Sequence, residues 1–467
     1  MNLDNISAIA TAPGYSGVGI IRVSGHAALK IALALTKKNV FIHKLATYCD
    51  FYSNDGEILD SGLIIYFKAP HSFTGEEVIE IHGHGSPVVL QMLIKRTLEL
   101  GCRLATPGEF SQRAYLNGKI DLIQAESIID LIHAESEATA KSAIKSLKGR
   151  FSEQIEQINQ QLINLRMFVE ATLDFPDEDI EFIANAKIHD KLNALVTEIN
   201  QLLANTKQGV LLNNGADIVI IGRPNVGKSS LLNTLANEDI AIVTDIAGTT
   251  RDIIKEKIII NGIAFNVIDT AGIRITTDIV EQLGIKRTFT ALKNAALCLV
   301  LVDANTGVTA EDESILQQIP QNIPRLFVHN KIDLLIGGYD QLQKLDFVKE
   351  TFIQTYEVNA KIHRAVNQIH VYISAKSKIG IDQLRSKILS LVGFDNNNHD
   401  IFVARTRHLN AIELAVEHIQ GAFNNWDNLE VLAEELRYAH NKLSEITGEF
   451  SSDDLLGEIF SKFCIGK

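Results

Sequence analysis

The sequence has few of the residues that mark secreted, metal-binding or membrane-spanning proteins. Its 467 residues include only four cysteines, which are far apart and form no CxxC pair. We therefore expect neither a disulfide framework nor a structural zinc site. No apolar run approaches the roughly 18–20 residues of a membrane span. The start, MNLDNISAIATAPG, lacks the basic segment of a secretory signal, so we expect a cytoplasmic protein that does not enter a membrane.

Positive charge is also in short supply, because 44 lysines and arginines face 57 aspartates and glutamates, for a net charge of −13. This balance argues against a broad electrostatic grip on nucleic acid, but not against a local basic site or a partner that supplies positive surface. A hydrophobic share of 46% with only eight prolines is typical of a globular, helix-rich protein. The length predicts two to four domains.

Three textures along the chain predict a multidomain protein with α+β, helical and α/β parts. Residues 1–118 mix β-rich runs with helical stretches and turns, which indicates an α+β domain. Residues 119–212 contain almost no glycine and have the apolar spacing of long amphipathic helices. From 213 to 392, strands, loops and helices alternate as in a doubly wound parallel sheet. Residues 393–467 return to helical periodicity, so we expect the α/β domain to be inserted between two halves of one helical domain.

The segment GRPNVGKSS has the pattern of a phosphate-binding loop between a strand and a helix. Glycines at 222 and 227 let backbone N–H groups surround a β-phosphate. Lys228 can bridge the β- and γ-phosphates, and the Ser229 hydroxyl can bind Mg²⁺. The further nucleotide contacts predicted in this loop are Asn225, Val226, Gly227 and Ser230.

Two later motifs predict recognition of guanine. The first, Asn330, Lys331 and Asp333, follows the apolar strand RLFVH. Its aspartate can accept two hydrogen bonds from guanine that adenine cannot supply, so discrimination against ATP should be large. The base pocket is completed by a second motif after the strand HVYI, namely Ser374, Ala375 and Lys376.

The residues between these motifs should surround the γ-phosphate. Asp269 ends a strand, where it can reach the Mg²⁺ shell, and the Gly272 N–H can meet the γ-phosphate. A switch threonine should complete the Mg²⁺ shell with Ser229, and we choose Thr250. The other contacts with GTP predicted here are Thr244, Asp245, Ile246, Ala247, Gly248, Thr249, Thr270 and Ala271.

Ile273 follows at the position where Ras-type GTPases have the glutamine that orients the attacking water. An isoleucine side chain cannot hold a water molecule. The protein therefore either binds nucleotide without hydrolysing it or performs the hydrolysis by another arrangement.

The whole chain resembles the MnmE (also called TrmE) family of tRNA modification GTPases. The resemblance rests on GRPNVGKSSLLN and VTDIAGTTRD in the central part and on matching outer segments. These outer segments are APGYSGVGIIRVSG, SFTGEEVIEIHGHG, TPGEFSQRAYLNGKIDLIQAE, LDFPDEDI and LSEITGEFSSDDLLGEIFSKFCIGK. GTPases of the Era type share only the central part, so the resemblance to MnmE is specific.

The resemblance implies a potassium ion in place of the missing glutamine. A monovalent cation beside the β- and γ-phosphates can neutralise developing charge, as an arginine finger does elsewhere. Carried over to this sequence, its ligands are Asn225, Thr244, Ile246 and Thr249. The resemblance also makes Glu281 the candidate general base, acting on or through a water. From the residues alone, Glu281 is an ordinary surface charge on a helix.

The resemblance further implies that the N-terminal domain dimerises and binds a one-carbon tetrahydrofolate, in the 5-formyl or 5,10-methylene form. The implied contacts are Arg22, Glu80 and Lys119, with the terminal Lys467 nearby. From the residues alone, each of the first three is an ordinary exposed strand or turn residue, and only the resemblance makes it a folate contact. Cys464 is either a nucleophile or a packing residue, and His82 and His84 lack a third partner at metal-ligand spacing.

The function implied is a GTP hydrolase of tRNA modification that forms a homodimer and, with the FAD-dependent protein MnmG (GidA), a heterotetramer. Together they would add an aminomethyl or carboxymethylaminomethyl group at C5 of the wobble uridine of certain tRNAs, while GTP hydrolysis drives a conformational cycle. The alternative is a regulatory GTPase that binds ribosomes or RNA and does no one-carbon chemistry. Against the alternative, neither a KH-like GxxG module nor a basic tail follows the GTPase part.

Overall fold

The computed structural model divides the chain into two compact units. One comprises residues 1–129, 146–196 and 414–467, and the other comprises 130–145 and 197–413. The structure describes residues 4–174, 181–236, 255–269, 295–317, 320, 323–335, 347–351, 368–395, 401–449, 453–461, 463 and 466. The four segments expected from the sequence stay a prediction.

The first unit contains a six-stranded sheet in the order β3-β4-β5-β2-β1-β6. Its neighbours pair antiparallel, except that β6 runs parallel to β1. The strands are β1 (Asn5–Ile9), β2 (Ser16–Ser24), β3 (Ala46–Tyr52), β4 (Ile58–Phe67), β5 (Val78–Gly85) and β6 (Cys102–Leu104). Apolar residues at alternate positions of β2, β4 and β5 share a core with α1 (Ala28–Thr36) and α2 (Pro87–Glu99). The mixture of strands and helices expected for this part of the chain is thus confirmed.

The other face of this sheet meets a third helix, α3 (Glu109–Leu116). Its fully buried Phe110 packs with Ile6 and Ala8 of β1. Because side chains alternate along a strand, Arg22 of β2 lies on this face while its neighbours Ile21 and Val23 lie in the core on the opposite face. The α3 side of the sheet therefore carries Arg22 and Glu80, its partner on β5, which the sequence analysis had singled out.

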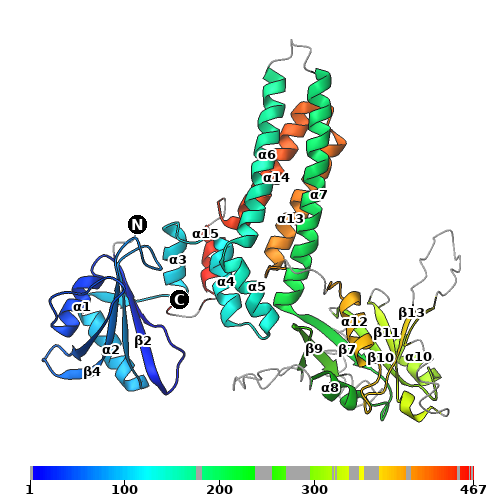
Figure 1. The fold of residues 1–467 in the computed structure, drawn as a ribbon, viewed down its shortest axis with the longest axis horizontal. Coiled ribbons are helices and arrows are strands. Elements are labelled where there is room, and N and C mark those ends of the chain that lie inside the picture. Colours follow the sequence, from blue (N-terminus) through cyan, green and yellow to red (C-terminus); the bar gives the residue numbers. More distant parts are fainter. Residues whose placement is uncertain are drawn as a thin grey trace, which may run out of the picture. The chain divides into compact units, whose positions relative to one another are not determined.

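Long helices follow, as the sequence predicted. They are α4 (Leu122–Ile132), α5 (Glu137–Leu147), α6 (Arg150–Asp174), α7 (Glu181–Asn214), α13 (Thr406–Asn424) and α14 (Leu429–Thr447). Helices α6 and α14 run alongside each other (Figure 1). Ile155, Leu162 and Val169 recur every seven residues on α6 and are buried, which is the spacing of a helix-packing stripe. The expected amphipathic helices are thus confirmed.

The chain's last helix, α15 (Asp453–Ser461), returns to the beginning of the first unit. Phe460 and Phe463 pack against Leu122 and Ala125 of α4, and α15 also contacts α3. At the end of α14, the Gly448 carbonyl accepts a 2.6 Å hydrogen bond from the Tyr115 hydroxyl of α3. These contacts place the C-terminal segment beside the N-terminal sheet.

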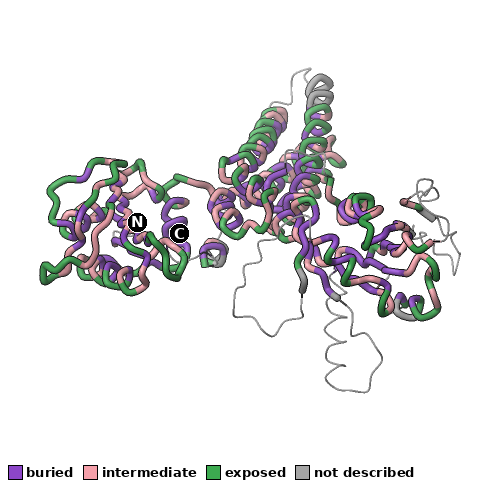
Figure 2. The backbone as a smooth tube through the Cα atoms, turned by 60° about the horizontal axis from the view of Figure 1, so that its bottom comes forward, coloured by how far each residue is buried: buried purple, intermediate pink, exposed green. Residues whose placement is uncertain are grey.

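The second unit contains a seven-stranded sheet in the order β12-β13-β11-β10-β7-β9-β8. Its five inner strands are parallel, and the edge strands β8 (Lys255–Ile260) and β12 (Val348–Thr351) are antiparallel. The inner strands are β7 (Ala216–Ile221), β9 (Ile263–Asp269), β10 (Leu297–Asp303), β11 (Arg325–Asn330) and β13 (Gln368–Tyr372). Separate apolar clusters cover the two faces, so these strands are largely buried (Figure 2). This doubly wound sheet confirms the predicted fold class.

Four short elements of this unit position the site. They are α8 (Lys228–Ala236), α10 (Ala310–Leu316), the 3₁₀ turn η1 (Ile332–Leu334) and α12 (Ile381–Leu391). Within the residues that the structure describes, no helix is long and apolar enough to cross a membrane.

Candidate functional site

The phosphate loop connects the carboxyl end of β7 to α8. Asn225 has the left-handed φ of 64° and Gly227 a φ of 102°, which together turn the backbone around the loop. A Cβ on Gly227 would crowd the side-chain amide of Asn330, and the φ of 102° is one that other residues rarely adopt, so glycine is strongly favoured there. Ser229 and Ser230 are exposed at the start of α8, while Val226 is buried. The loop therefore presents backbone N–H groups and a serine hydroxyl at a helix N-terminus, as a phosphate site requires.

Lys228 folds back across this loop. Its ammonium group donates a 2.8 Å hydrogen bond to the carbonyl of Gly222 at the other end of the loop. The positive charge thus lies over the ring of backbone that would hold phosphates. This position fits a lysine that neutralises phosphate charge, so the loop suits the phosphates of a nucleoside triphosphate.

Asn330 links the phosphate loop to the guanine motifs. Its buried amide donates to the carbonyl of Val226 (2.8 Å) and accepts from the N–H of Ala375 (3.0 Å). The Ser374 hydroxyl donates to the carboxylate of Asp333 at 2.7 Å. The structure therefore brings together residues that the sequence holds about 150 positions apart, at the carboxyl edge of the sheet where doubly wound folds bind ligands. Lys376 is exposed beside them.

Asp303, at the end of β10, holds the lysine of the guanine motif. Lys331 has a left-handed φ of 68°, and its ammonium lies 2.9 Å from Asp303. Burial raises the pKa of Asp303, but the bonds from Lys331 and Asn305 outweigh it and hold that pKa below its ordinary value. The sequence reasoning did not single out Asp303. Its position directly after the buried strand LCLVLV was the available signal.

Many predicted site residues lie outside the described residues. They are Thr244, Asp245, Ile246, Ala247, Gly248, Thr249, Thr250, Thr270, Ala271, Gly272, Glu281, Cys464 and Lys467. Asp269 is the last residue of β9, so its backbone stands at the carboxyl edge of the sheet as expected. The roles assigned to all of these residues stay predictions.

A second polar site lies on the α3 side of the N-terminal sheet. Arg22 and Glu80 stand directly opposite each other on β2 and β5. Two nitrogens of the Arg22 guanidinium, Nε and Nη2, donate to the same Glu80 oxygen at 3.0 and 2.8 Å. The third, Nη1, lies 3.4 Å from the carbonyl of Gly466 near the chain's end. The rings of Phe73 and Phe110 flank the guanidinium at 5.8 Å.

Lys119 has a different partner from the Arg22–Glu80 pair. It is exposed, and its ammonium donates to the Pro70 carbonyl at 3.0 Å. The two histidines of the sequence IHGHG pair separately with carboxylates: His82 lies 3.4 Å from Glu80, and His84 lies 2.7 Å from Asp60. Within the described part of the chain, no group of three His, Cys, Asp or Glu side chains could hold a metal ion.

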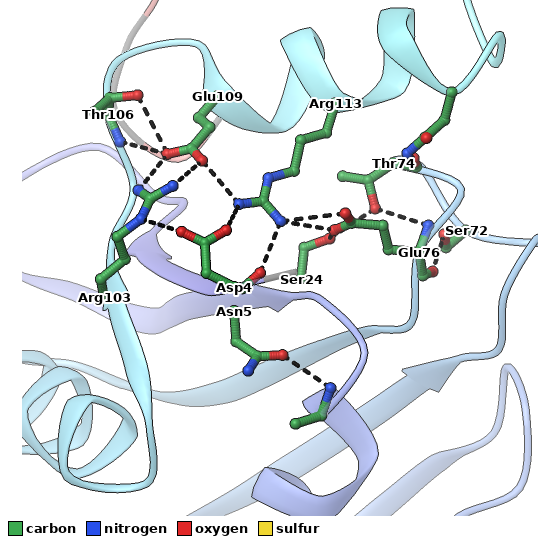
Figure 3. Close-up of polar contacts among 12 residues, drawn as sticks. Asp4, Asn5, Ser24, Ser72, Thr74, Glu76, Arg103, Thr106, Glu109 and Arg113 are labelled. Carbon is green, nitrogen blue, oxygen red and sulfur yellow. Dashed lines mark hydrogen bonds and ion pairs between the residues drawn. The ribbon is translucent and has the colours of Figure 1, made fainter. Parts of the chain in front are cut away.

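A network of ion pairs around the buried Arg113 and Glu109 lies beside this site and was not anticipated from the sequence (Figure 3). Arg113 bonds to three carboxylates, those of Asp4, Glu76 and Glu109. Glu109 also accepts two bonds from Arg103, at 2.8 and 2.5 Å. The network borders a pocket of about 680 Å³. Because every carboxylate in it is paired, the network fastens α3 to Arg103 of β6 and to Asp4 just before β1 rather than leaving free groups for a ligand.

The phosphate loop, the two guanine motifs and the doubly wound sheet together define a P-loop GTPase with additional α+β and helical parts. Comparisons with known proteins carry this further. The family model "GTP-binding protein TrmE N-terminus" matches residues 5–119, and the model "MnmE helical domain" matches residues 122–464.

Curated relatives match over the full length. The chain is 50% identical over 462 residues to the tRNA modification GTPase MnmE of Chromobacterium violaceum, covering 99% of this chain and 98% of that one. It is 50% identical over 466 residues to that of Laribacter hongkongensis, covering 99% of both, and 48% identical to that of Legionella pneumophila over 100% of both. The chain belongs to the MnmE family of tRNA modification GTPases and is a GTP hydrolase that uses Mg²⁺. The alternative of a purely regulatory, ribosome-binding GTPase is therefore set aside.

Solved structures show a weaker likeness. Era of Aquifex aeolicus is 26% identical over 44% of this chain and 66% of its own, with a TM-score of 0.26. The G domain of FeoB from Methanococcus jannaschii is 27% identical over 38% of this chain and 97% of its own, with a TM-score of 0.24. Likenesses at these TM-scores add nothing to the family assignment.

Proposed function

We propose that this GTPase modifies C5 of the wobble uridine of certain tRNAs with a one-carbon unit taken from a tetrahydrofolate. The product is an aminomethyl or carboxymethylaminomethyl group, made together with an FAD-dependent partner, MnmG (GidA). The observation that carries the proposal is the Arg22–Glu80 pair, a joined cation and carboxylate on a sheet face that the C-terminal segment reaches. Membership in the MnmE family supports the tRNA substrate.

The residues around this pair suit a folate. A carboxylate such as Glu80, oriented by the Arg22 guanidinium that contacts it, can accept bonds from the donor edge of a pterin. The exposed Lys119 can balance the glutamate tail. Phe73, 36% exposed beside the guanidinium, offers an aromatic face for a ring. The bound 5-formyl- or 5,10-methylene-tetrahydrofolate would supply the carbon. Lys467 stays in this proposal because it directly follows Gly466, whose carbonyl contacts Arg22.

The residues proposed to bind GTP have separate roles, which follow from their positions. Lys228 and Ser229, at the start of α8, hold phosphate and Mg²⁺, while Asp333 reads the base. Thr250 is proposed as the second Mg²⁺ ligand, and Glu281 as the base that acts on water. Potassium would be held by Asn225, Thr244, Ile246 and Thr249, and its charge would offset charge developing between the phosphates. The exposed amide of Asn225 fits this role, since its carbonyl oxygen is a neutral, hard donor.

We also propose a homodimer formed through the N-terminal domain, and a heterotetramer with MnmG. The edge strand β3 and its neighbour β4 support the dimer, since they expose Tyr48 (68%), Ile58 (58%) and Leu63 (38%). Apolar side chains on an unpaired sheet edge favour association with another chain. The proposed domains are 1–118 for dimerisation and folate, 119–212 and 393–467 for the helical scaffold, and 213–392 for GTP.

The test combines folate binding with analysis of tRNA. Arg22→Ala should bind 5-formyltetrahydrofolate at least tenfold more weakly by calorimetry, because the substitution removes a charge-assisted group and leaves Glu80 unpaired. A deletion strain that carries this variant should lack the modified wobble nucleoside, as measured by mass spectrometry. GTP turnover of the purified variant should be unchanged.

The matched control is Lys95→Ala, which removes an exposed cation from α2 of the same domain. It should bind folate and restore the nucleoside like the unaltered protein. Full folate binding and full modification in the Arg22→Ala strain would refute the proposed site.

A further inference from the structure

Arg223, the second residue of the phosphate loop, reaches away from the loop toward the segment between β10 and α10. Its Nη2 donates to the Thr306 hydroxyl at 3.0 Å. Its Nε lies 3.4 Å from an oxygen of Asp312 in the first turn of α10. The Asp312 side chain is only 2% exposed and that of Arg223 is 25% exposed. A buried ion pair therefore connects the phosphate loop to a separate part of the sheet edge.

Asp312 is fixed within the start of α10 by two hydrogen bonds from Thr309. One oxygen, Oδ2, accepts from both the N–H (3.0 Å) and the hydroxyl (2.7 Å) of Thr309, which is one half of a capping box at the start of α10. The other oxygen, Oδ1, is buried and has no hydrogen-bond partner among the described residues, and the same holds for Nε of Arg223. Buried polar atoms without partners are costly, so the guanidinium and the carboxylate favour a closer, two-bond contact.

The phosphate loop has two parts, which are held by different contacts. The second part begins at Val226, whose carbonyl is bonded to Asn330, and continues into α8 with Lys228. The first part, residues 223–225, includes Asn225, whose side chain is exposed and whose backbone is left-handed. Arg223 joins this first part to Thr306 by a hydrogen bond and to Asp312 by an ion pair. The ion pair therefore acts on the part of the loop that carries Asn225, while the phosphate-holding part is fixed independently.

We propose that Arg223 is a positioning residue that, through Asp312, fixes the backbone at Asn225 and so sets the protein's affinity for potassium. The inference rests on the proposed role of Asn225 as a potassium ligand. Breaking the pair should lower the affinity for potassium. The affinity for GTP, which depends on Lys228 and Ser229, should stay unchanged. No side-chain contact of Arg223 with nucleotide is required.

The experiment measures potassium binding by thermal stabilisation of the full-length protein. With a non-hydrolysable GTP analogue and Mg²⁺ bound, K⁺ is titrated against Na⁺ at constant ionic strength. The midpoint in K⁺ is compared for the unaltered protein, Arg223→Ala, Asp312→Asn and the double variant. Affinity for the analogue is measured separately by fluorescence.

Both single variants should raise the midpoint about three- to tenfold, as loss of one charge-assisted contact does, with analogue affinity within about twofold. The double variant should go no further, because the two side chains act as a unit. Arg223→Lys should restore part of the response. The control is Lys257→Ala, which breaks a pair with Glu135 whose side chains are 53% and 49% exposed, and it should leave the midpoint unchanged.

The outcomes separate the two claims. An unaltered protein that responds equally to Na⁺ and K⁺ overturns the proposed potassium mechanism and this inference with it. A response in the unaltered protein with unshifted midpoints in the single variants overturns this inference alone. Additive shifts, or parallel losses of analogue affinity and melting temperature, also overturn it, since they indicate separate effects or general unfolding.

Discussion

Glu109 should make the N-terminal part of the protein sensitive to acid. Its side chain is 8% exposed and accepts bonds from Arg103, Arg113 and the Thr106 N–H. Burial raises the pKa of this carboxyl, but the bonds from Arg103, Thr106 and Arg113 outweigh it and lower the pKa to about 2. The substitution Glu109→Gln keeps the shape of the side chain while removing the charge that these groups require.

The size of the effect follows from the pKa. A carboxyl that titrates near 4.5 in the unfolded chain and near 2 in the folded one gains roughly 3 kcal/mol of stability. Arg103 and Asp4 are 41% and 40% exposed, so water screens part of the network, and we expect about 2 kcal/mol. This stabilisation is present above pH 4.5 and is lost as the pH falls toward 2, because the unfolded chain, whose carboxyl has the higher pKa, takes up the proton while the folded state does not.

Hydrogen–deuterium exchange of the full-length protein can measure this locally, which avoids assuming two-state unfolding of a multidomain chain. At pH 7, peptides covering β1 and α3 should open about 30-fold more often in Glu109→Gln. The difference from the unaltered protein should shrink as the pH is lowered toward 3. Peptides of the second unit should not change.

The control for this variant is Glu99→Gln, which removes the carboxylate of a surface pair with Arg96. Glu99 is 41% exposed, so the change should cost less than about 0.5 kcal/mol. Equal exchange in Glu109→Gln and the unaltered protein at pH 7, or a difference that persists unchanged at pH 3, would show that the network does not stabilise the fold through charge.

Two predictions concern the GTPase site. Asp333→Asn should weaken GTP binding and favour xanthosine triphosphate, whose purine carries an acceptor where guanine has a donor; competition binding measures this, and an unchanged preference would mean that Asp333 does not read the base. Glu281→Ala should lower kcat by at least tenfold with GTP affinity nearly intact, because a residue that acts on water contributes mainly in the transition state; full turnover in a single-turnover assay would return Glu281 to the role of a surface charge.

The sequence by itself determined the nucleotide chemistry and the fold class. A phosphate loop is a local pattern, since its glycines, lysine and serine lie within a few residues between one strand and one helix. The order of the later motifs and the 3.6-residue periodicity of the helices are equally local or simply sequential. These features depend on short-range backbone geometry, so the fold class and the family could be inferred before any coordinates were considered.

The tertiary structure decided which distant side chains meet. Arg22 and Glu80 are partners because the register of β2 and β5 sets them opposite each other, and Gly466 joins them because α15 packs on α3 and α4. The pairing of Arg223 with Asp312 and the network around Glu109 depend in the same way on how helices dock on sheets. In the sequence, each of these charged residues stands alone, and a charged side chain is ordinarily expected on the exposed surface. Strand register and helix docking follow from packing of the whole core, which no short sequence pattern encodes.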